Sequence, residues 1–371
     1  MEQVEIIDFD HLGRGLAKLD GKVIFIPNTI PGEIVSFTIV QERKKFLVGE
    51  VSAFIKKSPK RIENICQYYP TCGGCQLLHL SYTEQLKYKE GKVENIFKKH
   101  GFRDVNIAPI VSSEQQFAYR NKATFHVQNE QIGFFQEKTN SIIPIEKCLL
   151  LDNKINDAIK NIPLNKQEIS IRSNGASVVY DKKEELLYPI GQFNFSVSLD
   201  SFFQVNNTVT PLLYEKVLDY LNPNITDTIM DLYCGTGTIG IFVSPYVKKA
   251  IGIEINRQAI FNANKNKNIN DITNIEFICG DAATIAKELN LFPDAIIVDP
   301  PRGGLEKRTV NILKKLSPNR IIYISCDPMT LARDLKLLAE KYDIDGITPF
   351  DMFPNTYHVE CVAKLNRKEQ D

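Results

Sequence analysis

Short apolar runs separated by turn residues occupy the first sixty residues of the chain. Residues 23–27, 32–40 and 46–51 are rich in β-branched and aromatic side chains, which favour strands. Each run is shorter than a typical helix, and the runs follow one another closely, as strands do in small barrels. The pattern therefore predicts a small β-barrel domain over residues 1–60.

The chain from residue 61 to residue 200 combines a helix with a sheet. Residues 81–99 predict an amphipathic helix, whose apolar stripe consists of Leu86, Val93, Ile96 and Phe97. Beyond about residue 107 the pattern returns to strands, at residues 122–127, 131–135, 168–172 and 176–180. We expect a central α+β domain with a mixed, mainly antiparallel sheet, and a helix that packs on the domain that follows.

Apolar strands alternate with helical stretches between residues 201 and 371. A helix over residues 210–221 precedes strands that read apolar throughout, at residues 228–233, 250–254, 275–279, 295–299 and 320–325. Strands with both faces buried have this character in parallel sheets that helices cover. The fold class predicted for the whole chain is therefore α/β, with a doubly wound, Rossmann-like domain at the C-terminal end.

Composition agrees with an ordinary globular protein. The 371 residues include 45 basic and 45 acidic side chains, and 43% are hydrophobic. No run approaches the roughly 20 apolar residues that a membrane helix needs, so we expect no membrane partner. Eight cysteines without a secretion signal predict a cytoplasmic protein whose thiols bind metal or take part in catalysis rather than form disulfides.

Basic side chains gather near the predicted barrel although the net charge is zero. They are Arg43, Lys44, Lys45, Lys56, Lys57, Lys60 and Arg61. Lysines of this kind either protect a strand edge or face RNA, and the sequence leaves both readings open. The stretch 117–122 mixes aromatic and basic residues, which suits a base-stacking platform or an ordinary amphipathic strand.

Glycines and carboxylates follow the predicted parallel strands at their carboxyl ends, where ligands bind in such sheets. Gly235 and Gly237 allow close backbone approach, and Glu254 can accept bonds from ribose hydroxyls. Asp231 and Asp281 suit the cationic tail and the adenine amino group of S-adenosylmethionine. A dinucleotide is the alternative, because residues 235–240 also fit its glycine pattern. A carboxylate beside its pyrophosphate would, however, oppose binding.

The next two strand ends carry groups suited to covalent chemistry. Asp299 ends the fourth strand, and Cys326 ends the fifth strand just before a helix, whose positive end favours the thiolate. Carbon 5 of a pyrimidine is a poor nucleophile, but a thiolate that adds to C6 makes C5 able to attack a sulfonium methyl group. A base must then remove the C5 proton. Glu360 is the preferred base, and His358 competes with it.

These motifs together resemble the RNA uracil-C5 methyltransferases that act on bacterial 23S rRNA and tRNA. The matching segments are Ser201-Phe-Phe-Gln-Val-Asn206, Asp231-Leu-Tyr-Cys-Gly-Thr-Gly237, Asp299-Pro-Pro-Arg-Gly-Gly304, Ser325-Cys-Asp-Pro-Met-Thr330 and Phe353-Pro-x-Thr-x-His-Val-Glu360. They recur in the family's order over nearly the whole chain.

The resemblance implies roles for individual residues. Cys326 is the implied nucleophile and Glu360 the implied proton acceptor. The residues implied to line the S-adenosylmethionine pocket are Gln204, Tyr233, Thr238, Glu254, Asp281 and Asp299. The family often has Asn at the position of Thr238, whose hydroxyl can still donate and accept one bond. Gly13-x-Gly15 and Gly32-Glu33 resemble the RNA-binding TRAM module, which implies an OB-like barrel.

Four further cysteines suit a metal site: Cys66, Cys72, Cys75 and Cys148. Zinc and an iron–sulfur cluster are equally compatible with four thiolates. The resemblance favours a [4Fe–4S] cluster, because the rRNA-type branch of the family carries one at these positions. We expect a structural role for the cluster.

The implied partner is structured RNA, bound by a monomer. A stacked uridine is inaccessible, so the base must leave its stack and enter the cleft. The cluster cysteines and the TRAM-like domain favour 23S rRNA, with tRNA as the alternative substrate. A catalytically silent RNA-binding module and an NAD-dependent oxidoreductase are the alternatives of other classes. A DNA cytosine-C5 enzyme is disfavoured, because it has proline before the nucleophile where this chain has Ser325.

Overall fold

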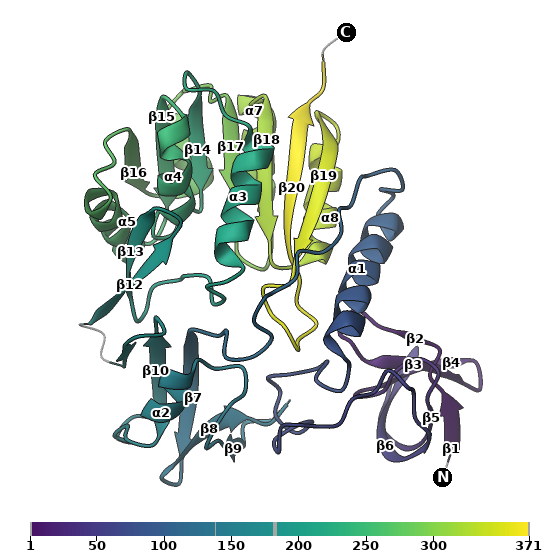
Figure 1. The fold of residues 1–371 in the computed structure, drawn as a ribbon. Helices are drawn as coiled ribbons and strands as arrows, with labels where there is room; N and C mark the ends of the chain where they lie inside the picture. Colours follow the sequence, from purple (N-terminus) through teal and green to yellow (C-terminus); the bar gives the residue numbers. More distant parts are fainter. Residues whose placement is uncertain (1, 138, 181–183, 370–371) are drawn as a thin grey trace.

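The computed structural model describes residues 2–137, 139–180 and 184–369. The outer ends of the first and third predicted domains, residue 1 and residues 370–371, lie outside these ranges. Figure 1 shows the C-terminal sheet in the upper part of the molecule, the central sheet at lower left and the N-terminal sheet at lower right. Within the described ranges, no helix is both long and apolar enough to cross a membrane.

The N-terminal sheet is the strand-rich, OB-like part that the sequence predicts. Its strands, in sheet order, are β1 (Glu2–Glu5), β5 (Ile34–Glu42), β6 (Phe46–Lys56), β4 (Lys22–Ile26), β3 (Gly15–Leu19) and β2 (Asp8–Phe9). Alternate side chains face a common core that includes Ile24, Val35 and Phe37. The sequence pattern missed β1, β2 and β3, because these strands are short and their exposed side chains are polar.

The central sheet is mainly antiparallel, as predicted. Its strands, in sheet order, are β11 (Val178–Val179), β10 (Glu168–Ser173), β7 (Lys122–Gln128), β8 (Gln131–Phe135) and β9 (Ile142–Pro144). Helix α2 (Asn153–Ile159) packs on it through Ile155 and Ile159. A separate hairpin, β12 (Glu185–Ile190) with β13 (Phe193–Ser198), contributes Phe193 and Phe195 to the core of the C-terminal sheet.

The C-terminal sheet has the doubly wound architecture that the sequence predicts. Its strands, in sheet order, are β16 (Ile275–Cys279), β15 (Lys249–Glu254), β14 (Thr228–Leu232), β17 (Ala295–Val298), β18 (Arg320–Ser325), β20 (Glu360–Arg367) and β19 (Tyr342–Phe350). The strands from β16 to β18 are parallel, whereas β20 runs antiparallel to both of its neighbours. The strand order reverses between β14 and β17, which is where such sheets bind ligands.

Helices cover both faces of this sheet (Figure 1). One face packs on α3 (Thr210–Leu221), α4 (Thr238–Val243) and α5 (Arg257–Ile269). The other packs on α6 (Ala282–Glu288), α7 (Lys307–Leu316), α8 (Pro328–Leu338) and α1 (Tyr82–Lys99). Helix α1 lies beside α8 and buries Val93, Ile96 and Phe97 there. This long helix therefore ties the region after the barrel to the C-terminal sheet.

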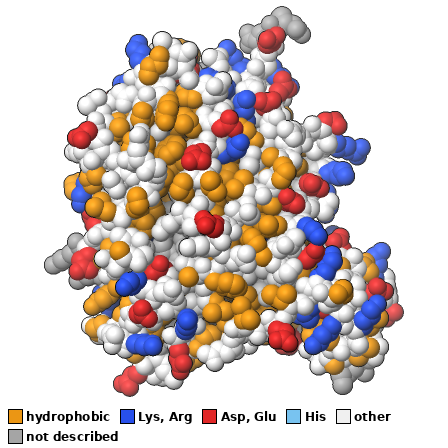
Figure 2. Space-filling view, in the orientation of Figure 1, with side chains coloured by type: hydrophobic (Ala, Val, Ile, Leu, Met, Phe, Trp, Pro, Cys, Tyr) orange, Lys and Arg blue, Asp and Glu red, His pale blue; other side chains and the backbone are white. Residues whose placement is uncertain are grey.

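The N-terminal barrel is docked on the rest of the chain. Ile30 of the barrel packs with Leu77, Leu80 and Tyr88 in one apolar cluster. Figure 2 shows Lys and Arg side chains on the exposed face of the barrel, interspersed with acidic ones. Arg43, Lys44, Lys45, Lys56 and Lys57 are exposed, so they remain available to either of the predicted roles, whereas Lys60 pairs with Glu84 at 2.9 Å.

The structure excludes Arg61 from the exposed basic strip, and it excludes the base-stacking reading for Tyr119. Arg61 does not face solvent as part of the basic strip, because its guanidinium donates to both carboxylate oxygens of the fully buried Glu33, at 2.6 and 2.7 Å. Tyr119 cannot stack on a base, because it is 3% exposed and its hydroxyl donates to the carbonyl oxygen of Pro354 at 3.0 Å. Both residues hold parts of the chain together instead.

Candidate active site

The eight residues that the sequence assigns to catalysis and cofactor binding line one cavity of about 630 Å³, here called the main cavity. They are Gln204, Tyr233, Thr238, Glu254, Asp281, Asp299, Cys326 and Glu360. Most of them follow the carboxyl ends of parallel strands, which share one edge of the sheet. Because β20 is antiparallel, its first residue, Glu360, lies at that same edge.

The turn after β14 brings the backbone close to the cavity. Tyr233 and Gly237 have φ angles of 65° and 79°, in the left-handed region that favours glycine. A Cβ atom on Gly237 would also lie 2.5 Å from the ring of Phe277, so only glycine fits there. Glu254 holds the turn from the next strand, since its carboxylate accepts the N–H of Gly235 at 3.2 Å.

Two acids lie in low-dielectric surroundings at the base of the main cavity. Asp231 is 1% exposed, and its Oδ2 accepts the N–H of Gly240 at 3.0 Å, whereas its buried Oδ1 has no partner. Burial and the neighbouring Asp299 raise the pKa of Asp231 to about 8. Burial likewise raises the pKa of Asp299 to about 7. A cationic ligand would favour the ionised form of both acids, so the site suits a sulfonium or ammonium group.

The opposite part of the cavity carries groups suited to an adenosine. The hydroxyl of Tyr233 lies 2.9 Å from that of Thr309, which orients the phenol ring. Asp281 caps α6, and its free oxygen pairs with Arg308 at 2.9 Å. Burial opposes ionisation of Asp281, but bonds from Thr284 and the charge of Arg308 lower its pKa. The Asp281 carboxylate is therefore ionised and already occupied by a cation.

Thr238 and Gln204 take part in contacts that the sequence did not predict. The hydroxyl of Thr238 lies 2.7 Å from that of Tyr214, whose ring is buried under α4. The carbonyl oxygen of Gln204 accepts a bond from Asn121 Nδ2 at 2.9 Å, which ties the central sheet to the cavity wall. The Asn121 bond fixes the backbone at Gln204, whereas the Thr238–Tyr214 bond joins side chains of α4 and α3.

Cys326 and Glu360 lie at the ends of adjacent strands. Ser325 at the end of β18 pairs with Cys361 in β20, so the next residue on each strand is Cys326 and Glu360 respectively. Burial and the carboxyl group of Glu360 raise the pKa of the Cys326 thiol to about 12. The predicted gain of the thiolate from the start of α8 is thus outweighed, because burial and nearby acids favour the thiol.

Glu360 rather than His358 reaches the main cavity. Glu360 is 3% exposed, and burial followed by the charge of Asp299 raises its pKa well above its ordinary value. The described residues that line the cavity do not include His358, which lies against Tyr357 and Phe353. Burial lowers the pKa of His358 to about 3, so its imidazole is neutral.

The main cavity is also lined by residues to which the sequence reasoning gave no individual role, among them Arg302, Phe202 and Arg120. Arg302 lies in the segment after β17. Its positive charge opposes the rise in the pKa of both Cys326 and Glu360, although burial and nearby acids outweigh it. Phe202 lines the cavity and is 70% exposed, and Arg120 reaches the cavity from the central domain. The cation in the Asp-Pro-Pro-Arg segment and the paired phenylalanines at 202–203 were available signals for two of them.

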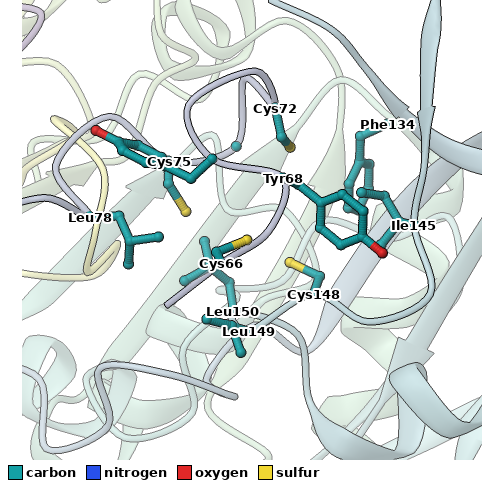
Figure 3. Close-up of a pocket in the computed structure, with 12 residues that line it drawn as sticks. Cys66, Tyr68, Cys72, Cys75, Leu78, Phe134, Ile145, Cys148, Leu149 and Leu150 are labelled. Carbon is teal, nitrogen blue, oxygen red and sulfur yellow. The ribbon is translucent and has the colours of Figure 1, made fainter. Parts of the chain in front are cut away.

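The four cysteines assigned to metal lie around one second cavity, here called the cysteine cavity. Figure 3 shows the sulfur atoms of Cys66, Cys72, Cys75 and Cys148 facing a common space lined by Leu78, Phe134 and Ile145. Among residues 2–137, 139–180 and 184–369, no group of three or more Cys, His, Asp or Glu side chains is close enough together to hold a metal ion. Burial raises the pKa of Cys72, Cys75 and Cys148, and their neighbouring thiols add to the shift.

Family models match both the C-terminal and the N-terminal parts of the chain. The model described as tRNA (uracil-5-)-methyltransferase matches residues 164–368, and the TRAM domain model matches residues 2–52. An uncharacterized RNA methyltransferase of Clostridium acetobutylicum is 33% identical over 99% of this chain and 97% of that protein. An uncharacterized RNA methyltransferase of Staphylococcus aureus is 32% identical over 98% of this chain and 97% of that protein.

A solved structure matches the whole arrangement of domains. It is the Pyrococcus abyssi tRNA (uracil-54, C5)-methyltransferase in complex with S-adenosyl-L-homocysteine, with 27% sequence identity and a TM-score of 0.77. The match covers 98% of this chain and 99% of that chain. Together with the family model and the relatives, it shows that this chain belongs to the tRNA (uracil-5-)-methyltransferase family, whose S-adenosylmethionine-dependent enzymes methylate uracil in RNA.

Proposed function

We propose that this protein methylates carbon 5 of a uridine in structured RNA, with Cys326 as the nucleophile and Glu360 as the base. One observation carries the proposal: the two residues lie at adjacent strand ends and line the same cavity as the six assigned cofactor residues. A nucleophile, a base and a methyl donor site must share one space for this chemistry, because each acts on the same pyrimidine ring.

The residues of the chain divide the reaction between them. The Cys326 thiol loses its proton to solvent, and the resulting thiolate adds to C6 of the uracil, which places an electron pair on C5 and the O4 enolate. S-adenosylmethionine supplies the methyl group that C5 takes up as the sulfur leaves. The Glu360 carboxylate then removes the C5 proton, the C5–C6 double bond forms, and the thiolate leaves C6. Arg302 favours the anionic forms of both residues.

The main cavity fits S-adenosylmethionine on the chemistry of its acids. The unpartnered Oδ1 of Asp231 and the nearby Asp299 offer acceptors to the cationic methionine end. Glu254 offers acceptors to the ribose, and Asp281 with the ring of Tyr233 suits the adenine. Gln204 and Thr238 complete the proposed set from the walls formed by residues 201–206 and by α4.

The uridine is proposed to enter the cavity unstacked, because its C5 is inaccessible in a helix. The exposed ring of Phe202 suits stacking on a base at the mouth, and Arg120 suits a phosphate or a carbonyl oxygen there. The barrel offers further cations, Arg43, Lys44 and Lys45, which are exposed and project from the β5–β6 turn. RNA would thus be bound at two places, the mouth of the main cavity and the β5–β6 turn.

The cysteine cavity is proposed to hold a [4Fe–4S] cluster with a structural role. The four sulfur atoms surround one space lined by apolar side chains, and four thiolates can ligate either a [4Fe–4S] cluster or zinc. The resemblance to the cluster-bearing branch of the family favours the cluster. Iron and acid-labile sulfide measured on anaerobically purified protein test this. Stoichiometric zinc without sulfide would overturn it.

We propose 23S rRNA as the substrate, on the combination of the four cluster cysteines with the TRAM domain. The tRNA alternative has its own support, since the solved structure that matches over 98% of this chain is described as a tRNA (uracil-54, C5)-methyltransferase. Function as a cytoplasmic monomer remains a prediction that sedimentation and fractionation would test.

The deciding experiment compares RNA from cells with and without the gene. The 5-methyluridine positions of 23S rRNA and tRNA are mapped in both strains and after complementation with the wild type or with Cys326→Ala. One modified uridine that disappears without the gene, and returns only with the wild type, supports the proposal. A silent RNA-binding module predicts no change in either RNA, and an oxidoreductase predicts bound nicotinamide cofactor.

A further inference from the structure

The segment that leads to Glu360 is held by contacts from distant parts of the chain. Residues 351–359, here called the β19–β20 loop, connect β19 to β20 and carry Phe353, which lines the main cavity next to Glu360. Figure 1 shows this loop, in yellow, extending from the C-terminal sheet toward the central part of the molecule, with α1 beside the strands. Its path determines where Glu360 enters the cavity.

Asn355, near the middle of this loop, is bonded to the segment that carries the cysteines. Its carbonyl oxygen accepts the N–H groups of Gln76 and Leu77, both at 3.0 Å. These residues follow Cys75 directly, so one carbonyl of the loop is tied to the chain that forms the wall of the cysteine cavity. Asn355 is 3% exposed and has a φ of 67°, a conformation that asparagine tolerates better than most residues.

The side chain and the N–H of Asn355 bond to two other segments. Gln85 of α1 makes two contacts, because its Nε2 donates to Asn355 Oδ1 at 3.0 Å and its Oε1 accepts the Asn355 N–H at 2.9 Å. Asn355 Nδ2 donates to the carbonyl oxygen of Gln116 at 2.8 Å. Every polar group of this buried residue is therefore paired, each with a partner from outside the loop.

A second anchor lies one helical turn along α1. Lys89 and Asp351 are both fully buried, and Lys89 Nζ donates to Asp351 Oδ1 at 2.5 Å and to the carbonyl oxygen of Phe353 at 2.9 Å. Lys92 Nζ donates to the carbonyl oxygen of Tyr357 at 2.7 Å. Gln85, Lys89 and Lys92 share one face of α1, so this face contacts the β19–β20 loop at successive points.

These contacts exceed what a surface connection between two strands requires. A β-hairpin loop usually satisfies its own backbone and stays exposed, whereas this one depends on partners more than two hundred residues away for its buried groups. Tyr119 and Asn206 add two further long-range bonds, to the carbonyl oxygens of Pro354 and Met352 in the same loop. The network thus links the cysteine segment, α1 and the catalytic edge.

We propose that Asn355 is a positioning residue for Glu360: by joining the β19–β20 loop to Gln76 and Leu77 and to Gln85 of α1, it holds the Glu360 carboxyl where the C5 proton is removed. The proposal rests on the proposed function. In that function, Glu360 acts after methyl transfer and before Cys326 leaves. A displaced Glu360 therefore lets the protein–RNA adduct form but slows its release.

The test measures that adduct. Unmodified 23S rRNA and tRNA transcripts are incubated with S-adenosylmethionine and each variant, and covalent complexes are resolved on a denaturing gel beside turnover rates. Asn355→Ala is expected to lower kcat by about 10- to 100-fold, as small misplacements of a catalytic group do, and to increase the trapped adduct. Gln85→Ala is expected to give the same signature more weakly. Asn355→Gly also removes the side-chain bonds, but glycine adopts the left-handed φ without strain, so this variant is expected to lie between Asn355→Ala and the wild type.

Three controls separate positioning from loss of folding. Asn222→Ala removes another left-handed asparagine, at the end of α3, and is expected to leave turnover and adduct unchanged. The dissociation constant for S-adenosylmethionine is expected to stay within about twofold in every Asn355 variant, since the assigned cofactor residues lie outside the loop. Glu360→Gln is the positive control for a trapped adduct.

The outcomes distinguish the two levels of the argument. If Glu360→Gln traps adduct but Asn355→Ala and Gln85→Ala do not, the positioning role is wrong while the proposed function stands. A parallel fall of kcat, cofactor affinity and Tm in Asn355→Ala would also overturn positioning in favour of a general structural role. If Glu360→Gln forms no adduct on either RNA, the proposed function fails, and the role of Asn355 fails with it.

Discussion

Cys326 and Glu360 lie at the neighbouring ends of β18 and β20, one residue beyond the paired Ser325 and Cys361. This arrangement assigns each of them a different step, so their variants are expected to fail differently. Cys326→Ala is expected to abolish methylation and adduct formation while S-adenosylmethionine still binds, because the assigned cofactor residues are intact. Glu360→Gln is expected to slow turnover by about 100- to 10,000-fold and to accumulate adduct.

Isothermal titration with S-adenosylmethionine and a denaturing gel of the protein–RNA mixture measure the two effects. Cys279→Ser serves as the matched control, because Cys279 is an exposed thiol at another strand end. If Cys326→Ala methylates RNA at the wild-type rate, Cys326 is not the nucleophile.

The pair of acids at the base of the main cavity predicts a pH dependence of stability. Burial raises the pKa of Asp231 from an ordinary 3.8 to about 8. Between these two pH values the carboxyl group of Asp231 is protonated in the folded protein and ionised in the unfolded chain. The folded state binds more protons, and its stability therefore decreases as pH rises from about 4 to 8. Asp231→Asn cannot titrate, so its Tm relative to the wild type is expected to increase between pH 5.5 and pH 8.5 in the ligand-free protein.

The same acids predict the opposite trend for cofactor binding. Ionised Asp231 and Asp299 attract the cationic methionine end, so affinity for S-adenosylmethionine is expected to increase with pH through about 7 to 8. Binding at pH 7 should release protons, which titrations in buffers of different ionisation enthalpy detect. A wild-type affinity that is flat over this range, together with an unaltered affinity in Asp231→Asn, would contradict the assignment.

Arg308 occupies the carboxylate that the adenine amino group is proposed to use. Its guanidinium pairs with Asp281 at 2.9 Å at an exposed position, so the pair is weak and can be displaced. Arg308→Ala is expected to strengthen S-adenosylmethionine binding by about two- to fivefold, because a competitor for Asp281 is removed. Arg308→Lys should stay near the wild type, and Lys307→Ala controls for the loss of one positive charge on α7. Weaker binding in Arg308→Ala would mean that this cation contacts the ligand instead.

The Glu33–Arg61 pair is expected to stabilise the docked barrel. Glu33 is fully buried and Arg61 is 14% exposed, so Arg61→Ala leaves a buried carboxylate without its cation. This substitution is expected to lower the stability of the barrel by about 3 kcal/mol. Hydrogen exchange of the β5 and β6 amides measures the change. Lys22→Ala breaks an exposed pair with Glu42 on the same sheet and is expected to change exchange little. Equal effects of the two substitutions would rule out the buried pair as the anchor.

The strand ends of the C-terminal domain were predictable because the chemistry there is local in sequence. Apolar runs predict β14 and β18, and the residue after a buried parallel strand necessarily lies at the ligand-binding edge. That rule placed Asp299 and Cys326 near each other without knowledge of any contact between them. The reversed direction of β20 was the one further element needed to add Glu360.

Contacts between distant segments were not predictable in the same way. Nothing near Arg61 in the sequence indicates that its guanidinium will pair with a buried Glu33. Likewise, the sequence around Tyr119 gives no sign that its hydroxyl will donate to the carbonyl oxygen of Pro354. Asn355 belongs to the motif before Glu360, but its partners Gln85 and Gln116 are set by the tertiary fold. Residues that act through packing or long-range bonds need coordinates to be recognised.

The antiparallel insertion of β20 between β18 and β19 has a consequence for the placement of the base. β20 is the last described strand in the sequence, yet it lies inside the sheet rather than at its edge. Glu360 therefore reaches the ligand-binding edge only when β20 is paired with its neighbours. Substitutions that weaken this pairing should reduce the activity of the base without changing the parallel strands that carry the cofactor residues.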